Sequence, residues 1–260
     1  MDYTRLKYEI RGRTAFITLS RPEKHNALDD TMVNELSLAC TAAGRDSAVK
    51  VLILRAEGES FSSGADLAYL KKMSEYDFNQ NQKDSQQLMK LFLQISTLRK
   101  PVIALVQGPA LAGGCGLATV CDVIIAARET ATFGYTEVHI GFVPALVMVF
   151  LLKRIGEGRA RELTLRGNVI SADEALRIGL VNVVVPAMQL DQEGEKLAQE
   201  LADRNSGSSM GLIKELLGRI HGLSTPDALD YAANLNALTR MTEECKRGIA
   251  AFLKKEPLRW

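Results

Sequence analysis

Strand-like and helix-like patterns of apolar residues alternate along the first half of the chain. Runs rich in β-branched and aromatic residues, bounded by glycine or charged residues, occur at residues 6–10, 14–20 and 51–55 and predict strands. Between the last two runs, apolar residues with helical spacing follow Asp29 and Asp30, either of which can cap a helix. The predicted buried face of this helix consists of Met32, Leu36, Ala39, Cys40 and Ala43.

The alternation continues between residues 101 and 128. The run PVIALVQG at 101–108 predicts a buried strand, GGCGLATVC at 113–121 a short helix, and DVIIAAR at 122–128 the next strand. Strands joined by helices at this spacing require crossover connections. We therefore expect an α/β fold with a largely parallel sheet.

Beyond about residue 145 the pattern is mainly helical. The sequence SADE at 171–174 is a capping box, and Gly179 lies where its helix should end. Thr225 and Pro226 predict the N-cap and first residue of a long helix through Leu238. One further strand is predicted at VNVVV, residues 181–185, and the polar stretch 74–87 predicts a mobile segment over a site.

Composition and charge narrow the class of protein. The 260 residues are 47% hydrophobic and 24% charged, which is typical of a soluble globular protein. The 32 basic and 31 acidic residues leave a net charge of +1, which does not indicate a nucleic-acid partner. Charged residues interrupt the first twenty positions, and the longest apolar run, 142–152, is too short to cross a membrane.

The cysteines and histidines show no metal-binding pattern. The four cysteines form no CxxC pair, and the chain has three histidines. The cysteines are expected to be small buried residues in a reducing compartment. We expect a cytoplasmic protein, or a matrix protein whose targeting segment is absent, without a bound metal.

Small residues gather at two turns where a predicted strand leads into a helix. One turn is FSSGADL at 61–67, and the other contains Gly113 and Gly114. Two such turns could aim two backbone N–H groups at one oxygen, which is the construction of an oxyanion hole. Close helix–strand packing is the alternative explanation of the glycines. Ser62 and Ser63 are interpreted as turn formers rather than nucleophiles, because no histidine lies in a matching motif.

Five motifs together resemble the crotonase (enoyl-CoA hydratase/isomerase) superfamily, in order and over essentially the whole chain. They are SRPEKHNAL at 20–28, FSSGADL at 61–67, VQGPALAGGCGLATVCD at 106–122, FGYTEVHIGFVPA at 133–145 and ISADEALRIGLVNVVVP at 170–186. The resemblance implies a spiral of ββα units at 1–195 and a helical region at 196–260 that mediates trimerisation, commonly with pairing into hexamers. It implies an acyl-CoA thioester substrate, of which coenzyme A is a part, and no further cofactor.

The resemblance also implies catalytic roles. The backbone N–H groups of Ala65 and Gly113 would form the oxyanion hole, and Glu137 would be the acid/base. The second glutamate of the hydratase pattern would fall at position 116, where this chain has Gly116. One carboxyl group must then perform both proton transfers, and the missing side chain is expected to leave room for a branched or bulky acyl group.

The residues that the resemblance places around the substrate come from all parts of the chain. The set is Lys24, His25, Ala27, Ser63, Ala65, Asp66, Leu67, Leu111, Gly113, Gly114, Gly116, Thr136, Phe252 and Lys255. Lys24 and His25 would line the CoA nucleotide. Phe252 and Lys255 resemble positions near the adenine and phosphates, in some relatives supplied by a neighbouring subunit.

Three functions are compatible with these residues. The long motifs most resemble bacterial hydratases of branched, 3-methylglutaconyl-type acyl-CoA, which favours hydration of an α,β-unsaturated thioester. A single glutamate also resembles Δ3,Δ2-enoyl-CoA isomerases. The third alternative is a CoA-thioester or RNA-binding member with little catalysis, and the near-neutral charge argues against RNA.

Overall fold

A six-stranded sheet forms the centre of the computed structural model, which describes residues 3–260 except for the side chain of Leu67. Its strand order is β1-β2-β3-β4-β6-β9. β1 and β2 are antiparallel, and the other neighbouring strands are parallel. The strands are β1 (Leu6–Arg11), β2 (Thr14–Leu19), β3 (Val51–Ala56), β4 (Val102–Val106), β6 (Val123–Ala127) and β9 (Val183–Val185). The expected α/β fold with a largely parallel sheet is confirmed.

A smaller three-stranded sheet lies beside the main sheet. It contains β5 (Ala110–Leu111), β7 (Thr132–Gly134) and β8 (Ile170–Ser171), in that order. Its first strand follows β4 directly and leads into the short helix predicted at residues 113–121. The small sheet therefore holds the start of that helix in place.

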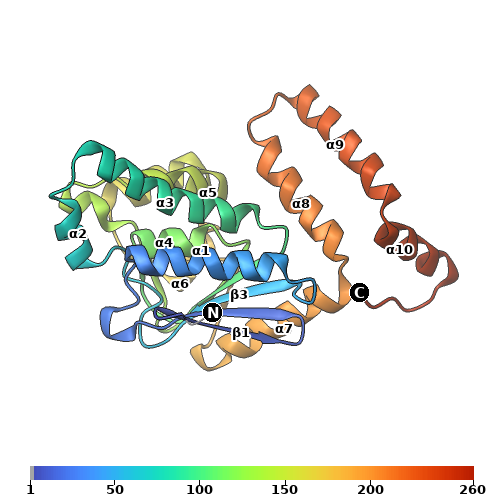
Figure 1. Cartoon of the computed structure of the whole chain (residues 1–260), viewed down its shortest axis with the longest axis horizontal. Coiled ribbons are helices and arrows are strands. Elements are labelled where there is room, and N and C mark those ends of the chain that lie inside the picture. The colour runs from blue at the N-terminus through green and yellow to red at the C-terminus, as the bar shows by residue number, and fades with distance from the viewer. Residues whose placement is uncertain (1–2) are drawn as a thin grey trace.

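Helices cover both faces of the main sheet (Figure 1). They are α1 (Asp30–Arg45), α2 (Leu67–Met73), α3 (Phe78–Thr97), α4 (Gly113–Thr119), α5 (Ala145–Arg166), α6 (Ala172–Arg177), α7 (Leu190–Arg204), α8 (Gly207–Ile220), α9 (Thr225–Met241) and α10 (Glu243–Lys254), with 3-10 turns η1 (Pro22–Lys24), η2 (Thr136–Ile140) and η3 (Ala187–Gln189). α1 packs against β1 and β2 on one face, and α7 packs against β2, β3, β4 and β6 on the other. Because both faces are covered, every residue of β2 and β4 is buried.

Local signals explain the helix starts. The Asp29 side chain accepts a hydrogen bond from the N–H of Met32 at the start of α1, and the predicted apolar face of that helix is buried. Ser171 caps α6 as expected. The start of α9 differs by one residue, because Ser224 rather than Thr225 is the N-cap and Pro226 follows in the first turn.

Two expectations about chain organisation concern the stretch 74–87 and the boundary at residue 195, and both stay predictions. Most of the stretch 74–87 is helical, because Asp77 and Gln80 form a capping box that starts α3. The expected boundary at residue 195 falls inside α7, whose buried Ala198 and Ala202 belong to the core around the sheet. The core therefore extends through α7, and the C-terminal helices begin with α8.

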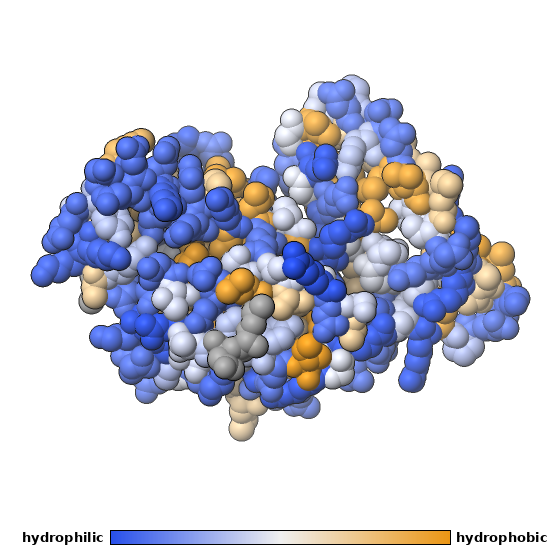
Figure 2. Space-filling view, viewed as in Figure 1, coloured by the Kyte–Doolittle hydropathy of each residue, from blue (hydrophilic) through white to orange (hydrophobic). Residues whose placement is uncertain are grey.

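The C-terminal helices project from the rest of the chain as an arm (Figure 1). No residue of α9 is buried. Figure 2 shows hydrophobic residues on the surface of this arm. The exposed apolar side chains of α8 to α10 include Ile213, Leu217, Leu229, Leu238, Ile249, Phe252 and Leu253.

Candidate functional site

Two backbone segments touch where β3 and β4 lead into their helices. Ser62 and Ala110 form an isolated β-bridge, and the N–H of Leu111 donates to the carbonyl oxygen of Ser62 at 2.9 Å. A Cβ on Gly114 would lie 2.3 Å from that same oxygen, closer than any real side chain can come. Gly114 therefore serves the contact between the two segments, which is the packing explanation considered from sequence.

Gly113 is different, because the protein itself leaves space around it. A Cβ there would meet its nearest neighbour, Cδ1 of Leu28, at an ordinary 3.7 Å. Ala112, the N-cap of α4, has a φ of 49° and a ψ of −125°, an uncommon conformation for a residue with a side chain. That conformation sets the direction of the next peptide group, which carries the Gly113 N–H.

The N–H groups of Ala65 and Gly113 are both unused. Among the hydrogen bonds of residues 3–260, none has either group as donor. Both residues line the same cavity. Two free donors from two chain segments, one of them at a helix N-terminus, suit an oxygen that carries negative charge.

A buried ion-pair network holds the Ala65 segment. Nη1 of Arg21 lies 3.0 Å from a carboxylate oxygen of Asp29 and 2.9 Å from one of Asp66. Asp66 also accepts hydrogen bonds from the N–H groups of Ala68 and Tyr69 at the start of α2. Burial acts to raise the pKa of Asp66, but these hydrogen bonds and the Arg21 charge outweigh it and lower that pKa.

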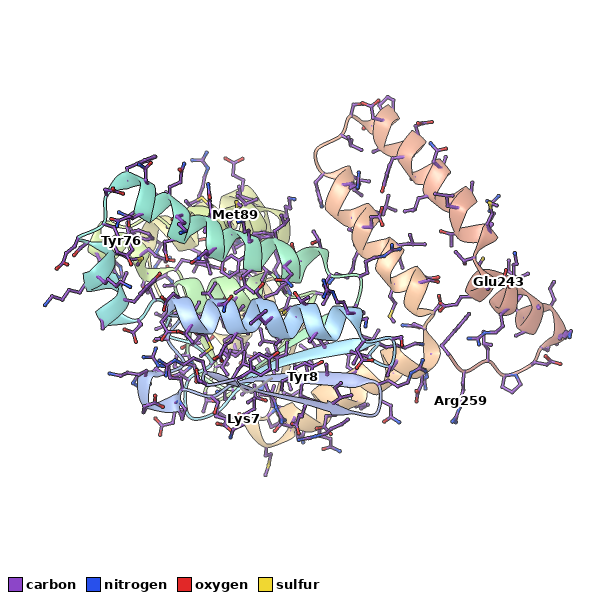
Figure 3. The ribbon with its side chains drawn as sticks, in the orientation of Figure 1. Lys7, Tyr8, Tyr76, Met89, Glu243 and Arg259 are labelled. Carbon is purple, nitrogen blue, oxygen red and sulfur yellow. The ribbon has the colours of Figure 1, made fainter. Side chains whose placement is uncertain are left out.

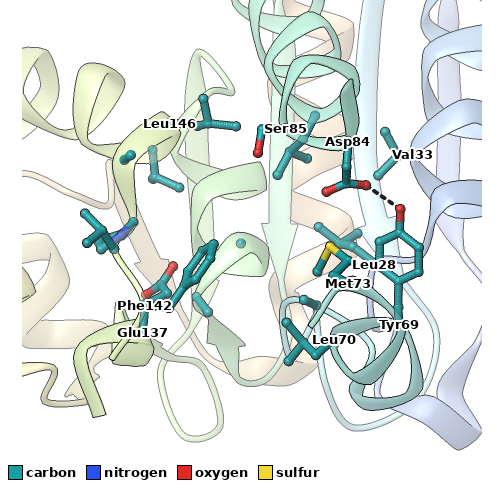
Figure 4. Close-up of a pocket in the computed structure, with 18 of the residues that line it drawn as sticks. Leu28, Val33, Tyr69, Leu70, Met73, Asp84, Ser85, Glu137, Phe142 and Leu146 are labelled. Carbon is teal, nitrogen blue, oxygen red and sulfur yellow. Dashed lines mark hydrogen bonds between the residues drawn. The ribbon is translucent and has the colours of Figure 1, made fainter. Parts of the chain in front are cut away.

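The cavity beside these donors has a volume of about 380 Å³. It lies between α2, α3, α4, η2 and the start of α5 (Figure 4). Most of its wall is apolar, which suits a hydrocarbon chain. The apolar side chains of the wall include Leu28, Val33, Leu70, Met73, Leu88, Ile140, Phe142, Val143, Leu146 and Val147.

Glu137 is a buried carboxyl group in this wall. It is 8% exposed, and its Oε2 atom has no hydrogen-bond partner among the described residues. Burial raises the pKa of Glu137 above its usual value. A buried carboxyl with a raised pKa exchanges protons more readily near neutral pH, as a general acid or base must.

The expected open space beside Gly116 does not exist. A Cβ on Gly116 would lie 2.6 Å from Cγ2 of Val147 and 3.3 Å from Cε2 of Phe92. Gly116 is buried and is absent from the described lining of the cavity. The prediction of room at this position is wrong, because side chains of α3 and α5 fill the place of a second glutamate.

Some of the residues expected around the substrate line the cavity, and others support it. Ala65, Gly113, Thr136 and Glu137 line the cavity, whereas Asp66, Leu111 and Gly114 do not and instead position the lining segments. The side chain of Leu67 lies outside the described residues.

The residues that were expected to line the CoA nucleotide, Lys24 and His25, belong to a loop that lies beside the Ala65 segment. The carbonyl oxygen of His25 accepts a hydrogen bond from the N–H of Ser63 at 3.0 Å. Lys24 is exposed, and Ala27 is buried. Their contact with CoA stays a prediction.

Phe252 and Lys255 lie far from the cavity of their own chain. Both belong to the end of the arm, where Phe252 is 82% exposed and Lys255 caps α10. Figure 3 places Glu243 of α10 on the opposite side of the molecule from Tyr76, which lies between α2 and α3. Any contact of these two residues with a substrate would have to be made in a neighbouring subunit.

Sequence analysis missed the polar end of the cavity. Tyr69 of α2 donates a hydrogen bond to Asp84 of α3, and both residues line the cavity (Figure 4). Asn81 and Ser85 of α3 lie in the same wall. The capping box of Asp77 and Gln80 was the signal that could have placed these residues on a helix.

Residues 3–260 contain neither a metal-binding cluster nor a membrane-spanning helix. No group of three or more His, Cys, Asp or Glu side chains is arranged to hold a metal ion. No helix in that range is long and apolar enough to cross a membrane.

Comparison with known proteins gives consistent matches. The family model described as enoyl-CoA hydratase/isomerase matches residues 9–260. A Thermus thermophilus protein with the provisional name enoyl-CoA hydratase is 41% identical over 96% of this chain and 98% of its own. The crotonyl-CoA hydratase of Syntrophomonas wolfei is 36% identical over 98% and 97%. The crystal structure of an enoyl-CoA hydratase from Shewanella pealeana superposes with a TM-score of 0.94 at 31% identity, over 99% and 96% of the two chains.

We expect Glu137→Gln to stabilise the fold at neutral pH. A carboxyl whose pKa is raised by folding contributes most to stability when it is protonated, and that contribution is lost as pH rises from the ordinary pKa through the raised one. The uncharged amide avoids this loss. The variant should melt at a higher temperature at pH 7, by about 2–4 °C for each kcal/mol gained in a chain of this size.

The gain should shrink as the pH approaches 4, where the parent carboxyl is protonated in both states. Differential scanning calorimetry at pH 4 to 8 measures it. Glu75→Gln, at an exposed position, is the matched control and should leave the melting temperature unchanged. A Glu137→Gln protein that melts at or below the parent temperature at pH 7 would contradict the electrostatic assignment.

Proposed function

Because this chain belongs to the enoyl-CoA hydratase/isomerase family, we propose that it hydrates the double bond of an α,β-unsaturated acyl-CoA. The observation that carries the proposal is the composition of one cavity wall. It contains two unused N–H donors, at Ala65 and Gly113, together with the buried carboxyl of Glu137. Such a wall suits a reaction in which charge develops on a carbonyl oxygen while a nearby carbon gains or loses a proton.

In this proposal the thioester oxygen accepts hydrogen bonds from the N–H groups of Ala65 and Gly113. Glu137 removes a proton from a water molecule as its oxygen bonds to the β-carbon. The electron pair of the double bond then moves toward the thioester, and an enolate oxygen forms between the two donors. Fixed donors that need no reorientation stabilise such an oxyanion by several kcal/mol, about 3–4 for one donor.

Glu137 completes the reaction by returning the proton to the α-carbon. The product is a 3-hydroxyacyl-CoA, and the carboxylate is regenerated. One carboxyl can serve as base and then acid because addition of water consumes no net proton. The raised pKa of Glu137 supports this role, since it reduces the cost of holding the proton between the two steps.

A double-bond isomerase is the second candidate. The specific observation in its favour is Gly116, whose surroundings are filled by Val147 and Phe92. With Glu137 as the single acid/base, removal of an α-proton from a 3-enoyl thioester would form a dienolate whose oxygen lies between the same two N–H donors, and Glu137 could return the proton at the γ-carbon. A CoA-thioester-binding protein with little catalysis is the third alternative, and it predicts no turnover of either substrate.

The acyl group that we propose is short. The motifs resemble hydratases of 3-methylglutaconyl-type thioesters, whereas a relative of similar length is named a crotonyl-CoA hydratase. The occupied space beside Gly116 removes the structural reason to expect a bulky branch near the double bond. We therefore propose a crotonyl-like chain without a bulky branch beside Gly116.

We also propose that the chain acts as a homotrimer, or as a hexamer of paired trimers, in the cytoplasm. The exposed apolar residues of α8 to α10 support association, because an arm with this much apolar surface gains from burial against another subunit. In such an assembly the Phe252 and Lys255 of one subunit could reach the nucleotide bound by another.

Hydration and isomerisation differ in the origin of the product oxygen. We expect purified protein in ¹⁸O-labelled water to convert crotonyl-CoA to 3-hydroxybutyryl-CoA that carries the label, with loss of the conjugated enoyl absorbance. Mass spectrometry of the product measures the label. Gain of conjugated absorbance from 3-enoyl-CoA, with no hydration of crotonyl-CoA, would instead favour the isomerase.

Glu137→Gln should retain affinity for acyl-CoA and lose turnover. The amide keeps the size of the side chain but cannot accept the proton, so we expect kcat to fall by roughly 10²–10⁴-fold, the usual contribution of one positioned acid/base. Titration calorimetry with butyryl-CoA and a crotonyl-CoA rate assay, on the same preparation, measure both quantities. Near-normal turnover would remove Glu137 from the mechanism.

A further inference from the structure

The far end of the cavity is closed by a hydrogen-bonded pair. Tyr69 of α2 and Asp84 of α3 meet on the opposite side of the cavity from Glu137 and Phe142 (Figure 4). A chain whose reacting carbons lie beside Glu137 would therefore extend toward this pair. A polar group at the end of a chain long enough to cross the cavity would meet the carboxylate of Asp84.

The pair, together with Asp30, Val33 and Gln87, lies between the cavity and an outer hollow. This second space has a volume of about 640 Å³ and lies between α1, α2 and α3, and Tyr69 and Asp84 line both spaces. Lys83 and Lys90 line the outer hollow but not the cavity. Within residues 3–260, no ion pair joins either lysine to Asp84.

The charged side chains that line the cavity are all acidic. They are Asp29, Asp30, Asp84 and Glu137, and no Lys, Arg or His belongs to the described lining. Asp29 is paired with Arg21, and Asp30 accepts a hydrogen bond from the N–H of Thr31. An anion that entered the far end would lose hydration and find no opposite charge in the wall.

Tyr69 does not offer this anion a free donor, because its hydroxyl donates to Asp84. Burial and this hydrogen bond raise the pKa of Tyr69, so the phenol stays protonated. The pair thus presents the Asp84 carboxylate to the cavity, while the hydroxyl of Tyr69 is already used in the hydrogen bond to that carboxylate. A methyl or other neutral group meets no such repulsion.

We propose that Asp84, held by Tyr69, is a specificity-determining residue that excludes acyl groups ending in a carboxylate. The inference rests on the proposed function, in that it takes this cavity as the acyl-CoA site. It narrows the substrate class to thioesters with a neutral acyl end, and so it disfavours 3-methylglutaconyl-type substrates.

Paired ligands that differ in one carboxylate test this directly. Titration calorimetry compares butyryl-CoA with glutaryl-CoA on the parent, on Asp84→Asn and on Glu75→Gln. We expect the parent to bind butyryl-CoA at least about tenfold more tightly, from repulsion between two partly buried charges a few ångströms apart. Asp84→Asn should reduce that ratio at least about fivefold, because the amide keeps the shape of the wall without its charge.

Glu75→Gln removes an exposed charge from the turn between α2 and α3 and should leave the ratio at the parent value. Equal affinities in the parent, or an unchanged ratio in Asp84→Asn, would overturn the proposal. If Asp84→Asn does not fold, Asp84→Ser makes the same charge change. Both readouts are affinities, so a protein that shows the expected ratio without hydrating crotonyl-CoA contradicts the proposed function alone. Failure of the parent to bind butyryl-CoA would overturn both.

Discussion

The close contact between Ser62 and Gly114 is the constraint on which the site depends. The carbonyl oxygen of Ser62 lies where a side chain at Gly114 would begin, so two strand-to-helix turns can meet backbone against backbone. The bridge from Ser62 to Ala110 extends that contact into the small sheet. As a result, Ala65 and Gly113, far apart in sequence, present their N–H groups to one cavity. A bulkier residue at Gly114 would separate the turns before it affected any group that faces the substrate.

The site combines several features that cost stability. Ala112 has an uncommon backbone conformation, two N–H groups lack acceptors, and the buried Oε2 of Glu137 has no partner. The strained backbone of Ala112 and the unpartnered buried oxygen of Glu137 each cost of the order of 1–3 kcal/mol. The surrounding structure offsets them, through the sheet covered on both faces and through the Arg21 network that fixes the Ala65 segment. Groups left unpaired in a rigid frame are available to a substrate whose charge changes during reaction.

Local sequence patterns predicted much of the fold, but they did not predict the contacts between segments that are distant in sequence. The strands, the Asp29 cap and the start of α4 follow from patterns within a few residues. The filled space at Gly116 could not be predicted, because it depends on Val147, which another helix brings into contact. The helix within the stretch 74–87 was not predicted, because its polar composition concealed the capping box that starts α3, and with it Asp84. The two small-residue turns predicted an oxyanion hole, whereas the choice of Ala65 and Gly113 as its donors and the role of Glu137 came from the family resemblance.

The central claim is that the Ala65 and Gly113 N–H groups together hold the thioester oxygen. The infrared spectrum of bound butyryl-CoA, labelled with ¹³C at the thioester carbonyl, tests it most directly. Two fixed donors in a site removed from water should polarise the carbonyl more strongly than water does. The account predicts that the labelled C=O band moves to a lower frequency on binding than in aqueous solution. A band that stays at the aqueous frequency or moves above it, with the ligand saturating the protein, would contradict the account.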